Sequence, residues 1–273
     1  MRAHCEYRLG PLYEDQWRQE ETDRIFLSAV EALALAVDAK DSLSSGHLKH
    51  VQRYTTEIAR SLGCGDQEVR TLEFGALLHD IGKIAVPEGF LTTPGRLSPE
   101  EFNHVASHVQ IGAEILAAVK FPLPVAELVL CHHENWDGTG YPRRLKGEAI
   151  PLTARILRVV DAFDALTTDR PYRPAMKVDE AIEHIKSRRG TAFGPRVTDV
   201  LIELLPRLEP EIRSDPLTNR QSSERSVLQS PRSIDVQQTS LTPEERIESL
   251  KQLRATARRP VEDDDLHAWR RWA

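Results

Sequence analysis

Histidines and aspartates occur in this chain where the apolar side of a predicted helix would otherwise continue. The clearest case begins at Val125 and Leu128, because the same helical spacing reaches His132 and His133. Both imidazoles are therefore expected to face the interior. A buried polar group without a partner costs several kcal/mol, so two adjacent inward-facing histidines need hydrogen-bond partners or a bound ion.

Four other predicted helices carry the same signal. An apolar stripe through Leu72 and Ala76 continues onto His79 and Asp80, just before Gly82 breaks the helix. The other three stripes begin or end at polar residues, namely His47, His108 and Asp161, the last with Asp164 on the same face. The helix that reaches His108 is predicted to start at Pro99, because Ser98-Pro99-Glu100-Glu101 forms a capping box with proline at the first helical position. Five helices are thus expected to direct polar side chains into one core.

Taken singly, each of these histidines is better explained as a hydrogen-bonded imidazole, whereas the whole set favours a metal centre. Imidazole and carboxylate ligands together suit iron, manganese or zinc. The set exceeds what one tetrahedral ion requires, which indicates a two-metal arrangement in which Asp80 can bridge the ions. The candidate ligands are His47, His79, Asp80, His108, His132, His133 and Asp161.

The composition limits the class of protein. The chain has 273 residues and a formal net charge of -6, which argues against a general nucleic-acid-binding protein. No stretch approaches the roughly 18 consecutive apolar residues of a membrane helix, and the N-terminus lacks the apolar core of a signal peptide. The three cysteines form no Cys-x-x-Cys pair. We therefore expect a soluble cytoplasmic protein that acts without a membrane or a nucleic-acid polymer as partner.

The sequence divides into three regions. Residues 1–21 form a polar leader, residues 22–208 read as successive amphipathic helices, and residues 209–273 are rich in polar residues and Pro. The middle region lacks the period-two alternation of strands, so an all-α helical bundle with a buried metal centre is predicted. The tail is predicted to be flexible and mostly disordered, with a short helix near residues 243–257.

Longer motifs surround the candidate ligands. They are Leu78-His79-Asp80-Ile81-Gly82-Lys83, the segment 132–142 with its Gly140-Tyr141-Pro142 turn, the segment 160–166, and the segment 169–173. Over about residues 40–205 the chain resembles the HD-GYP domain family of metal-dependent cyclic-di-GMP phosphodiesterases. The resemblance implies an HD-domain helical bundle and assigns residues 22–208 to the catalytic domain.

The resemblance also implies a centre of two or three metals in which Asp80 bridges two ions. Members with a third metal carry a glutamate one helical turn before the first ligand, and this chain has Leu43 there, so two divalent ions are predicted, iron or manganese. On this resemblance one ion is held by His47, His79, Asp80 and Asp161, and the other by Asp80, His108, His132 and His133.

The implied reaction is hydrolysis of cyclic di-GMP to pGpG by a metal-bridging hydroxide, with GMP as a further product left open. Asp80 and Lys83 are the implied catalytic residues. Lys83, Tyr141, Arg170 and Arg173 match positions that contact the cyclic dinucleotide, and cations there suit the negative charge that grows on a phosphodiester under attack. The Gly140-Tyr141-Pro142 loop is an implied contact for diguanylate cyclase domains, and a homodimer is a further option.

Two other functions stay open at this point. One is a receptor that binds cyclic di-GMP without cutting it, and the other is an HD-type metal phosphohydrolase that acts on another cyclic nucleotide or on a nucleoside phosphate. For His50, three residues after His47, a surface or hydrogen-bonding role is favoured over metal ligation. Cys131 is expected to be a small core residue rather than a ligand.

Overall fold

The computed structural model describes residues 11–41, 47–92, 97–119, 121, 123–169 and 174–214, and the regular structure in these ranges is helical. This confirms the predicted all-α fold. The α-helices are α1 (Pro11–Asp38), α2 (His47–Ser61), α3 (Asp66–Leu78), α4 (Glu88–Thr92), α5 (Pro99–Ala106), α6 (His108–Ala118), α7 (Val125–Cys131), α8 (Leu152–Thr167), α9 (Val178–Ser187) and α10 (Pro195–Ser214), and the short 3-10 helices are η1 (Ala39–Asp41), η2 (Ile81–Ala85) and η3 (Gly147–Ala149).

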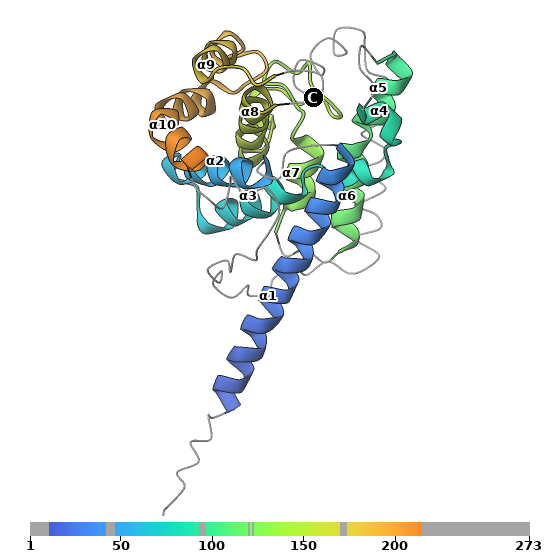
Figure 1. Cartoon of the computed structure of the whole chain (residues 1–273), viewed down its shortest axis with the longest axis vertical. Helices are drawn as coiled ribbons and strands as arrows, with labels where there is room; N and C mark the ends of the chain where they lie inside the picture. Colours follow the sequence, from blue (N-terminus) through green and yellow to red (C-terminus); the bar gives the residue numbers. More distant parts are fainter. Residues whose placement is uncertain are drawn as a thin grey trace, which may run out of the picture.

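The first helix begins earlier than the sequence pattern predicts. α1 starts at Pro11, although the polar leader was expected to extend to residue 21. The segment 11–21 is rich in Glu, Gln and Arg, which favour helix but mark no buried face, so apolar periodicity does not detect it. Figure 1 shows this N-terminal half of α1 extending away from the other helices. At the other end of the fold, α10 continues to Ser214, past residue 208, and the predicted tail helix lies outside the described residues.

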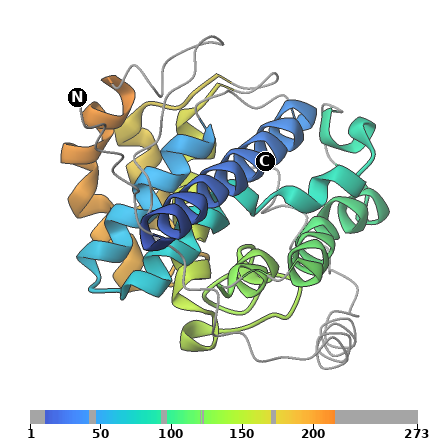
Figure 2. The ribbon, with the colours of Figure 1, turned by 90° about the horizontal axis from the view of Figure 1, so that it is seen from below.

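The C-terminal half of α1 packs on the core through Val30, Ala34 and Val37. Figure 2 shows the helix crossing one face of the body, and its end contacts η2 while η1 contacts α4. Other apolar residues of the same helix, Leu33 and Leu35 among them, are exposed. The helix therefore buries one stripe only, and its end is placed directly beside the His79-Asp80 segment.

The core lies around α2 and α8. α2 packs against α3, α8 and α10, and its inner face buries Val51 and Ile58 completely. α8 is buried on almost every side, with Ile156, Leu157 and Phe163 fully inaccessible. A second set of contacts joins α6 to α7 and to η2. These two sets of contacts bring together the ends of helices that are far apart in the chain.

The helix predicted to run from Pro99 to His108 is divided in two. The capping box at its start is confirmed, because the Glu101 amide donates to Ser98 and the Glu101 carboxylate accepts from the Ser98 amide. α5 ends at Ala106, and the Ser107 hydroxyl donates to the His104 carbonyl at 2.6 Å, which competes with the helical hydrogen bond. His108 consequently becomes the first residue of α6.

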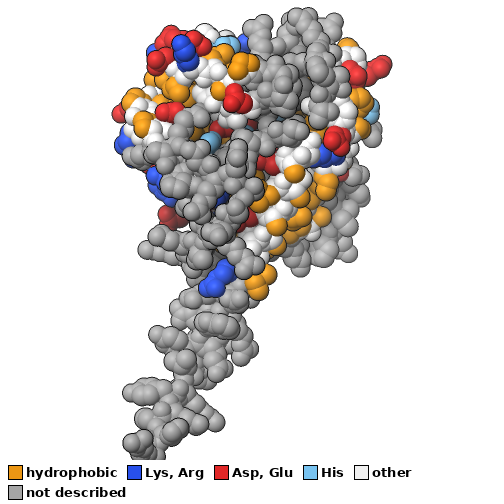
Figure 3. All heavy atoms as spheres, viewed as in Figure 1, with side chains coloured by type: hydrophobic (Ala, Val, Ile, Leu, Met, Phe, Trp, Pro, Cys, Tyr) orange, Lys and Arg blue, Asp and Glu red, His pale blue; other side chains and the backbone are white. Residues whose placement is uncertain are grey.

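Several large hydrophobic side chains are exposed. Figure 3 shows hydrophobic side chains gathered on the surface beside the described part of α1. The exposed large hydrophobic residues are Ile25, Leu33, Leu35, Ile84 and Val119. Among the described residues, none of the helices has both the length and the apolar character needed to cross a membrane.

Candidate metal centre

One group of potential ligands joins α2, α3 and α8. His47 is the first residue of α2, His79 follows the last residue of α3, and Asp161 lies in the middle of α8. One ligand atom from each lies within 4.8 Å of the others. A divalent ion can be held by such a set of two imidazoles and one carboxylate.

A second group of potential ligands joins α6 and α7. His108 begins α6, and His132 and His133 follow the last residue of α7; their ligand atoms also lie within 4.8 Å of one another. The Nε2 atoms of His108 and His132 face each other at 3.5 Å. In both rings Nδ1 donates to a backbone carbonyl, so the two Nε2 lone pairs face each other with no proton between them. An ion placed there would satisfy both lone pairs.

Asp80 lies between the two groups. Its Oδ2 atom is 3.2 Å from His79 Nε2, and its Oδ1 atom is 3.4 Å from His108 Nε2. One carboxylate thus directs an oxygen toward each group. The Lys83 ammonium is 2.8 Å from Oδ2 and balances part of the carboxylate charge. This arrangement fits a residue shared by two ions.

Helix ends fix the orientation of three of these imidazoles. His79, His108 and His132 each donate from Nδ1 to the carbonyl three residues earlier, at 3.0, 2.7 and 2.7 Å respectively. These carbonyls belong to the last turn of the helix before each histidine, where not every carbonyl has a helical partner. The bond fixes the tautomer and leaves the Nε2 lone pair directed into the site, as in many protein metal sites.

His47 is oriented by a carboxylate instead. Its Nδ1 atom donates to Asp164 Oδ2 at 2.6 Å, and His50 Nδ1 donates to the other oxygen of Asp164 at 3.1 Å. The hydrogen-bonding role expected for His50 is therefore observed. The Nε2 atom of His47 is buried and has no hydrogen-bond partner. An unpaired buried acceptor of this kind is satisfied when it ligates an ion.

The protonation of the two groups differs. Burial lowers the pKa of His132 and His133 well below the usual value, and burial also lowers the pKa of His108, so the second group holds neutral imidazoles suited to ligation. Burial opposes protonation of His79 as well, yet the Asp80 and Asp161 carboxylates raise the pKa of His79 to about 9. Without an ion, a proton occupies the place that an ion would take. The residues present thus fit divalent metal ions.

The predicted substrate-binding residues are placed only in part. Lys83 is buried next to Asp80, and the Tyr141 ring stacks on His133 with centroids 5.0 Å apart. Tyr141 also packs edge-on against Phe102 and is only 8% exposed, so in this structure it forms a wall of the site. Arg170 and Arg173 lie outside the described residues.

Two polar residues beside the centre were not identified from the sequence. The Glu134 carboxylate accepts hydrogen bonds from the amides of Arg143 and Leu145 at 2.7 and 3.0 Å, which ties the loop after Tyr141 to the ligand segment. The Arg158 guanidinium is buried and donates to the Asn135 side-chain oxygen at 3.3 Å. An arginine inside a run of buried apolar residues is unusual, and that was the available signal.

Cys131 stands directly before the ligand pair and is fully buried. Burial raises the pKa of its thiol to about 12, so the thiolate that a metal needs is not formed at neutral pH. The expected role as a small core residue is confirmed.

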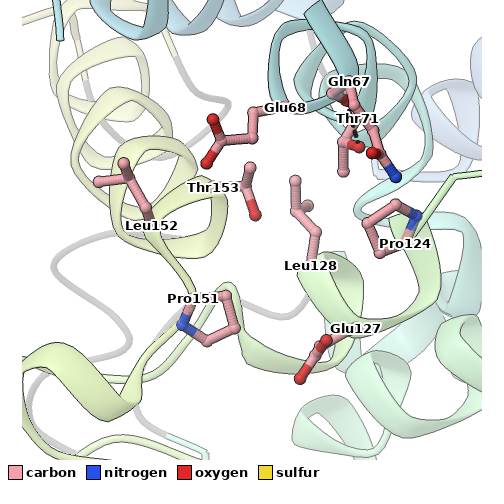
Figure 4. A pocket seen from close by; sticks show the side chains of 9 residues that line it. All are labelled: Gln67, Glu68, Thr71, Pro124, Glu127, Leu128, Pro151, Leu152 and Thr153. Carbon is pink, nitrogen blue, oxygen red and sulfur yellow. Dashed lines mark hydrogen bonds between the residues drawn. The ribbon is translucent and has the colours of Figure 1, made fainter. Parts of the chain in front are cut away.

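A separate pocket lies between the N-terminal ends of α3, α7 and α8. Figure 4 shows its lining, which includes Gln67, Glu68, Glu127 and Thr153, and its volume is about 300 Å³. None of the candidate ligands lines it, and its charged residues are acidic. This pocket is therefore unsuited to a phosphate ester.

Replacing Asp164 by asparagine should weaken metal binding at the His47 group by about 10- to 100-fold, because Asp164 orients His47 and raises the basicity of its Nε2 atom. Chelator competition on the purified protein measures the effect, with the exposed Asp179→Asn as the control. Loss of metal at the same chelator concentration in both variants would contradict the role given to Asp164.

An all-α bundle whose helix ends bring histidines and aspartates to one buried centre defines a class of helical metal-binding proteins. A family model described as an HD domain matches residues 31–197. The chain belongs to the HD-domain family and, by its His79-Asp80 and Gly140-Tyr141-Pro142 motifs, to the HD-GYP group within it.

Curated relatives agree with this assignment. The chain is 42% identical over 192 residues to the cyclic di-GMP phosphodiesterase response regulator RpfG of Xanthomonas campestris, covering 70% of this chain and 50% of that protein. It is 33% identical over 199 residues to 3'3'-cGAMP-specific phosphodiesterase 2 of Vibrio cholerae, covering 72% of this chain and 38% of that protein. The chain thus spans half or less of the length of these relatives.

A solved structure shares the fold. The crystal structure of a cyclic GMP-AMP-specific phosphodiesterase of V. cholerae superposes with a TM-score of 0.55 at 22% identity, over 70% of this chain and 51% of that chain. At this identity the likeness shows the helical fold alone.

Proposed function

We propose that this protein is a metal-dependent phosphodiesterase that hydrolyses cyclic di-GMP to pGpG. The observation that carries the proposal is the pair of ligand groups on either side of Asp80, with the Lys83 ammonium against the same carboxylate. Such a site suits a phosphodiester, because negative charge grows on the phosphate oxygens in the transition state. The name of the X. campestris relative supports the choice of substrate.

The proposed divalent ions would supply Lewis acidity toward the phosphate and lower the pKa of the attacking water. The residues of the chain do the rest. Asp80 holds the two halves of the centre in register, and Lys83 presents a positive charge to the leaving 3′ oxygen. Tyr141 shields the imidazole of His133 from water. Arg170 and Arg173 are proposed to bind the phosphates, since a guanidinium can donate two parallel hydrogen bonds to them.

Two ions per chain are proposed, because the centre contains two ligand groups and Leu43 cannot ligate a third ion. Iron or manganese is the proposed metal, since both accept mixed imidazole and carboxylate ligands. The cytoplasm is the proposed location, because the proposed substrate is a cytoplasmic second messenger. A homodimer is proposed on the exposed hydrophobic residues of α1, and the Gly140-Tyr141-Pro142 loop is proposed as the contact for a diguanylate cyclase domain.

A second candidate substrate is cyclic GMP-AMP, because a V. cholerae relative at 33% identity is named as specific for it. Both dinucleotides present two phosphodiesters to the same centre and differ in one base. A receptor that binds without cutting is less well supported, since the complete set of ligands would then serve no reaction.

Turnover by protein purified without oxygen tests the proposal. Cyclic di-GMP and cyclic GMP-AMP are supplied in parallel, the products are separated by chromatography, and metal content is measured in the same sample. We expect pGpG from cyclic di-GMP with about two ions per chain. Preferential cleavage of cyclic GMP-AMP would transfer the assignment to that substrate, and binding without cleavage by the metal-loaded protein would make it a receptor.

A further inference from the structure

Asp38 is an acidic residue beside the metal centre that the HD motif and its ligand partners do not include. It is the last residue of α1 and is only 7% exposed. Its Oδ2 atom is buried and has no hydrogen-bond partner. Aspartate is rarely buried without a partner, since desolvation of its charge is costly.

The surroundings of Asp38 are those of the first ligand group. Burial raises the pKa of Asp38, whereas the charges of His47, His79 and Lys83 lower it and that of Asp80 raises it further. The influence is mutual. Burial lowers the pKa of His47, but the Asp164 carboxylate raises it, and the charge of Asp38 also raises it. Asp38 thus lies within electrostatic range of both imidazoles of the first group.

A second buried polar atom on this side also lacks a hydrogen-bond partner. His47 Nε2 is buried without one, while Nδ1 of the same ring bonds to Asp164. Asp38 Oδ2 and His47 Nε2 are therefore two buried polar atoms without a hydrogen-bond partner, on residues whose charges act on each other. A cation satisfies both, whereas burial of either one alone is unfavourable.

A neighbouring side chain fastens the end of α1 that carries Asp38. Two residues later, the Lys40 ammonium donates to the carbonyls of Lys83, Ile84 and Val86 at 3.0, 2.9 and 2.5 Å. These three carbonyls are at the C-terminal end of η2, which carries Lys83 and directly follows Asp80. The end of α1 is thus fastened to the segment that supplies the shared carboxylate, and Asp38 cannot easily turn toward solvent.

We propose that Asp38 is an additional acidic ligand of the first ion, supplied by α1. The inference rests on the proposed two-ion centre and adds a residue to it. With Asp38, the first ion is surrounded by carboxylates from three elements, while the second ion is surrounded mainly by neutral imidazoles. Asp38 therefore makes the two positions unequal and gives the first the higher affinity for a hard divalent cation.

Manganese titration of the full chain tests this inference. Metal-free protein is prepared with a chelator, and Mn²⁺ binding is followed by the signal of free Mn²⁺ in electron paramagnetic resonance. Asp38→Asn should weaken the binding of one of the two ions by at least about tenfold and leave the affinity for the other unchanged. Glu31→Gln, on the same helix two turns earlier, is the matched control and should bind as the wild type does. Asp38→Glu keeps the charge and should restore most of the affinity.

Thermal unfolding separates ligation from packing. Without metal, Asp38→Asn should be as stable as the wild type or more stable, since the charge of a buried carboxylate with an unpaired oxygen is removed. With Mn²⁺, the variant should gain less in melting temperature than the wild type. A lower melting temperature without metal together with unchanged Mn²⁺ affinity would mean a packing role and overturn the proposal. If the wild-type protein binds no Mn²⁺, the metal centre itself is overturned. If the wild type is active and metal-loaded and Asp38→Asn binds Mn²⁺ equally well, this inference alone is overturned.

Discussion

Replacing Asp80 by asparagine will lower the turnover of cyclic di-GMP by at least about a thousandfold. Among the residues that the structure describes, Asp80 is the carboxylate that lies against both ligand groups, 3.2 Å from His79 and 3.4 Å from His108. Asparagine keeps the size of the side chain but loses the charge and one ligating oxygen, so the centre loses the group that holds its halves together. Loss of charge stabilisation at a reacting phosphate is among the largest effects of single substitutions.

The control for this experiment is Asp66→Asn, which changes an exposed aspartate on α3, the helix that ends just before His79 and Asp80. Turnover and metal content are measured together. Arg170→Ala serves as a second comparison, because it should raise the KM for the dinucleotide and leave the metal bound. Asp80→Asn turnover within tenfold of the wild type, or equal metal loss in the Asp80 and Arg170 variants, would contradict these assignments.

Replacing Gly82 by alanine should destabilise the fold by about 3 kcal/mol and strip the metal centre. A Cβ atom at this position would lie 1.9 Å from the His108 carbonyl oxygen and 2.6 Å from the Gly112 nitrogen. Both neighbours are backbone atoms, so no side chain can rotate to make room. η2 must then move away from α6, which separates Asp80 from His108.

Gly89→Ala is the matched control, because a Cβ there meets no atom within 4 Å. Gly89 lies in α4, where alanine favours helix, so this variant should be unchanged or slightly more stable. Urea unfolding and metal analysis of both variants are the measurements. A Gly82→Ala protein within 0.5 kcal/mol of the wild type would show that the contact between η2 and α6 can relax, against the expectation from backbone packing.

The contact between Gly82 and Gly112 illustrates a limit of sequence analysis. The sequence indicated Gly82 only as a residue that ends a helix. In the structure, α3 does end before it, and Gly82 lies in η2. The close approach of two backbones is a property of two elements packed together, and no local pattern encodes the partner. The same holds for Glu134, whose hydrogen bonds reach residues nine and eleven positions further along a loop.

Helix ends, by contrast, could be predicted well. His47 begins α2, the stripe through Leu72 ends at His79, and the capping box at Ser98 begins α5, all as expected from the sequence. These features are local, because periodicity and capping depend on residues within one or two turns. The start of α1 was missed because its sequence carries no apolar stripe to reveal it.

The sequence by itself therefore determined the kinds of ligand, the helix ends that carry them and, through its motifs, the family. Only the tertiary structure decided how they are grouped: Asp164 reaches His47 across 117 residues of chain, and the docking of α1 on η2 buries Asp38 within electrostatic range of His47. The reason is physical. Side-chain direction within a helix follows from local geometry, whereas distances between helices follow from how their apolar faces pack, and that depends on the whole core at once.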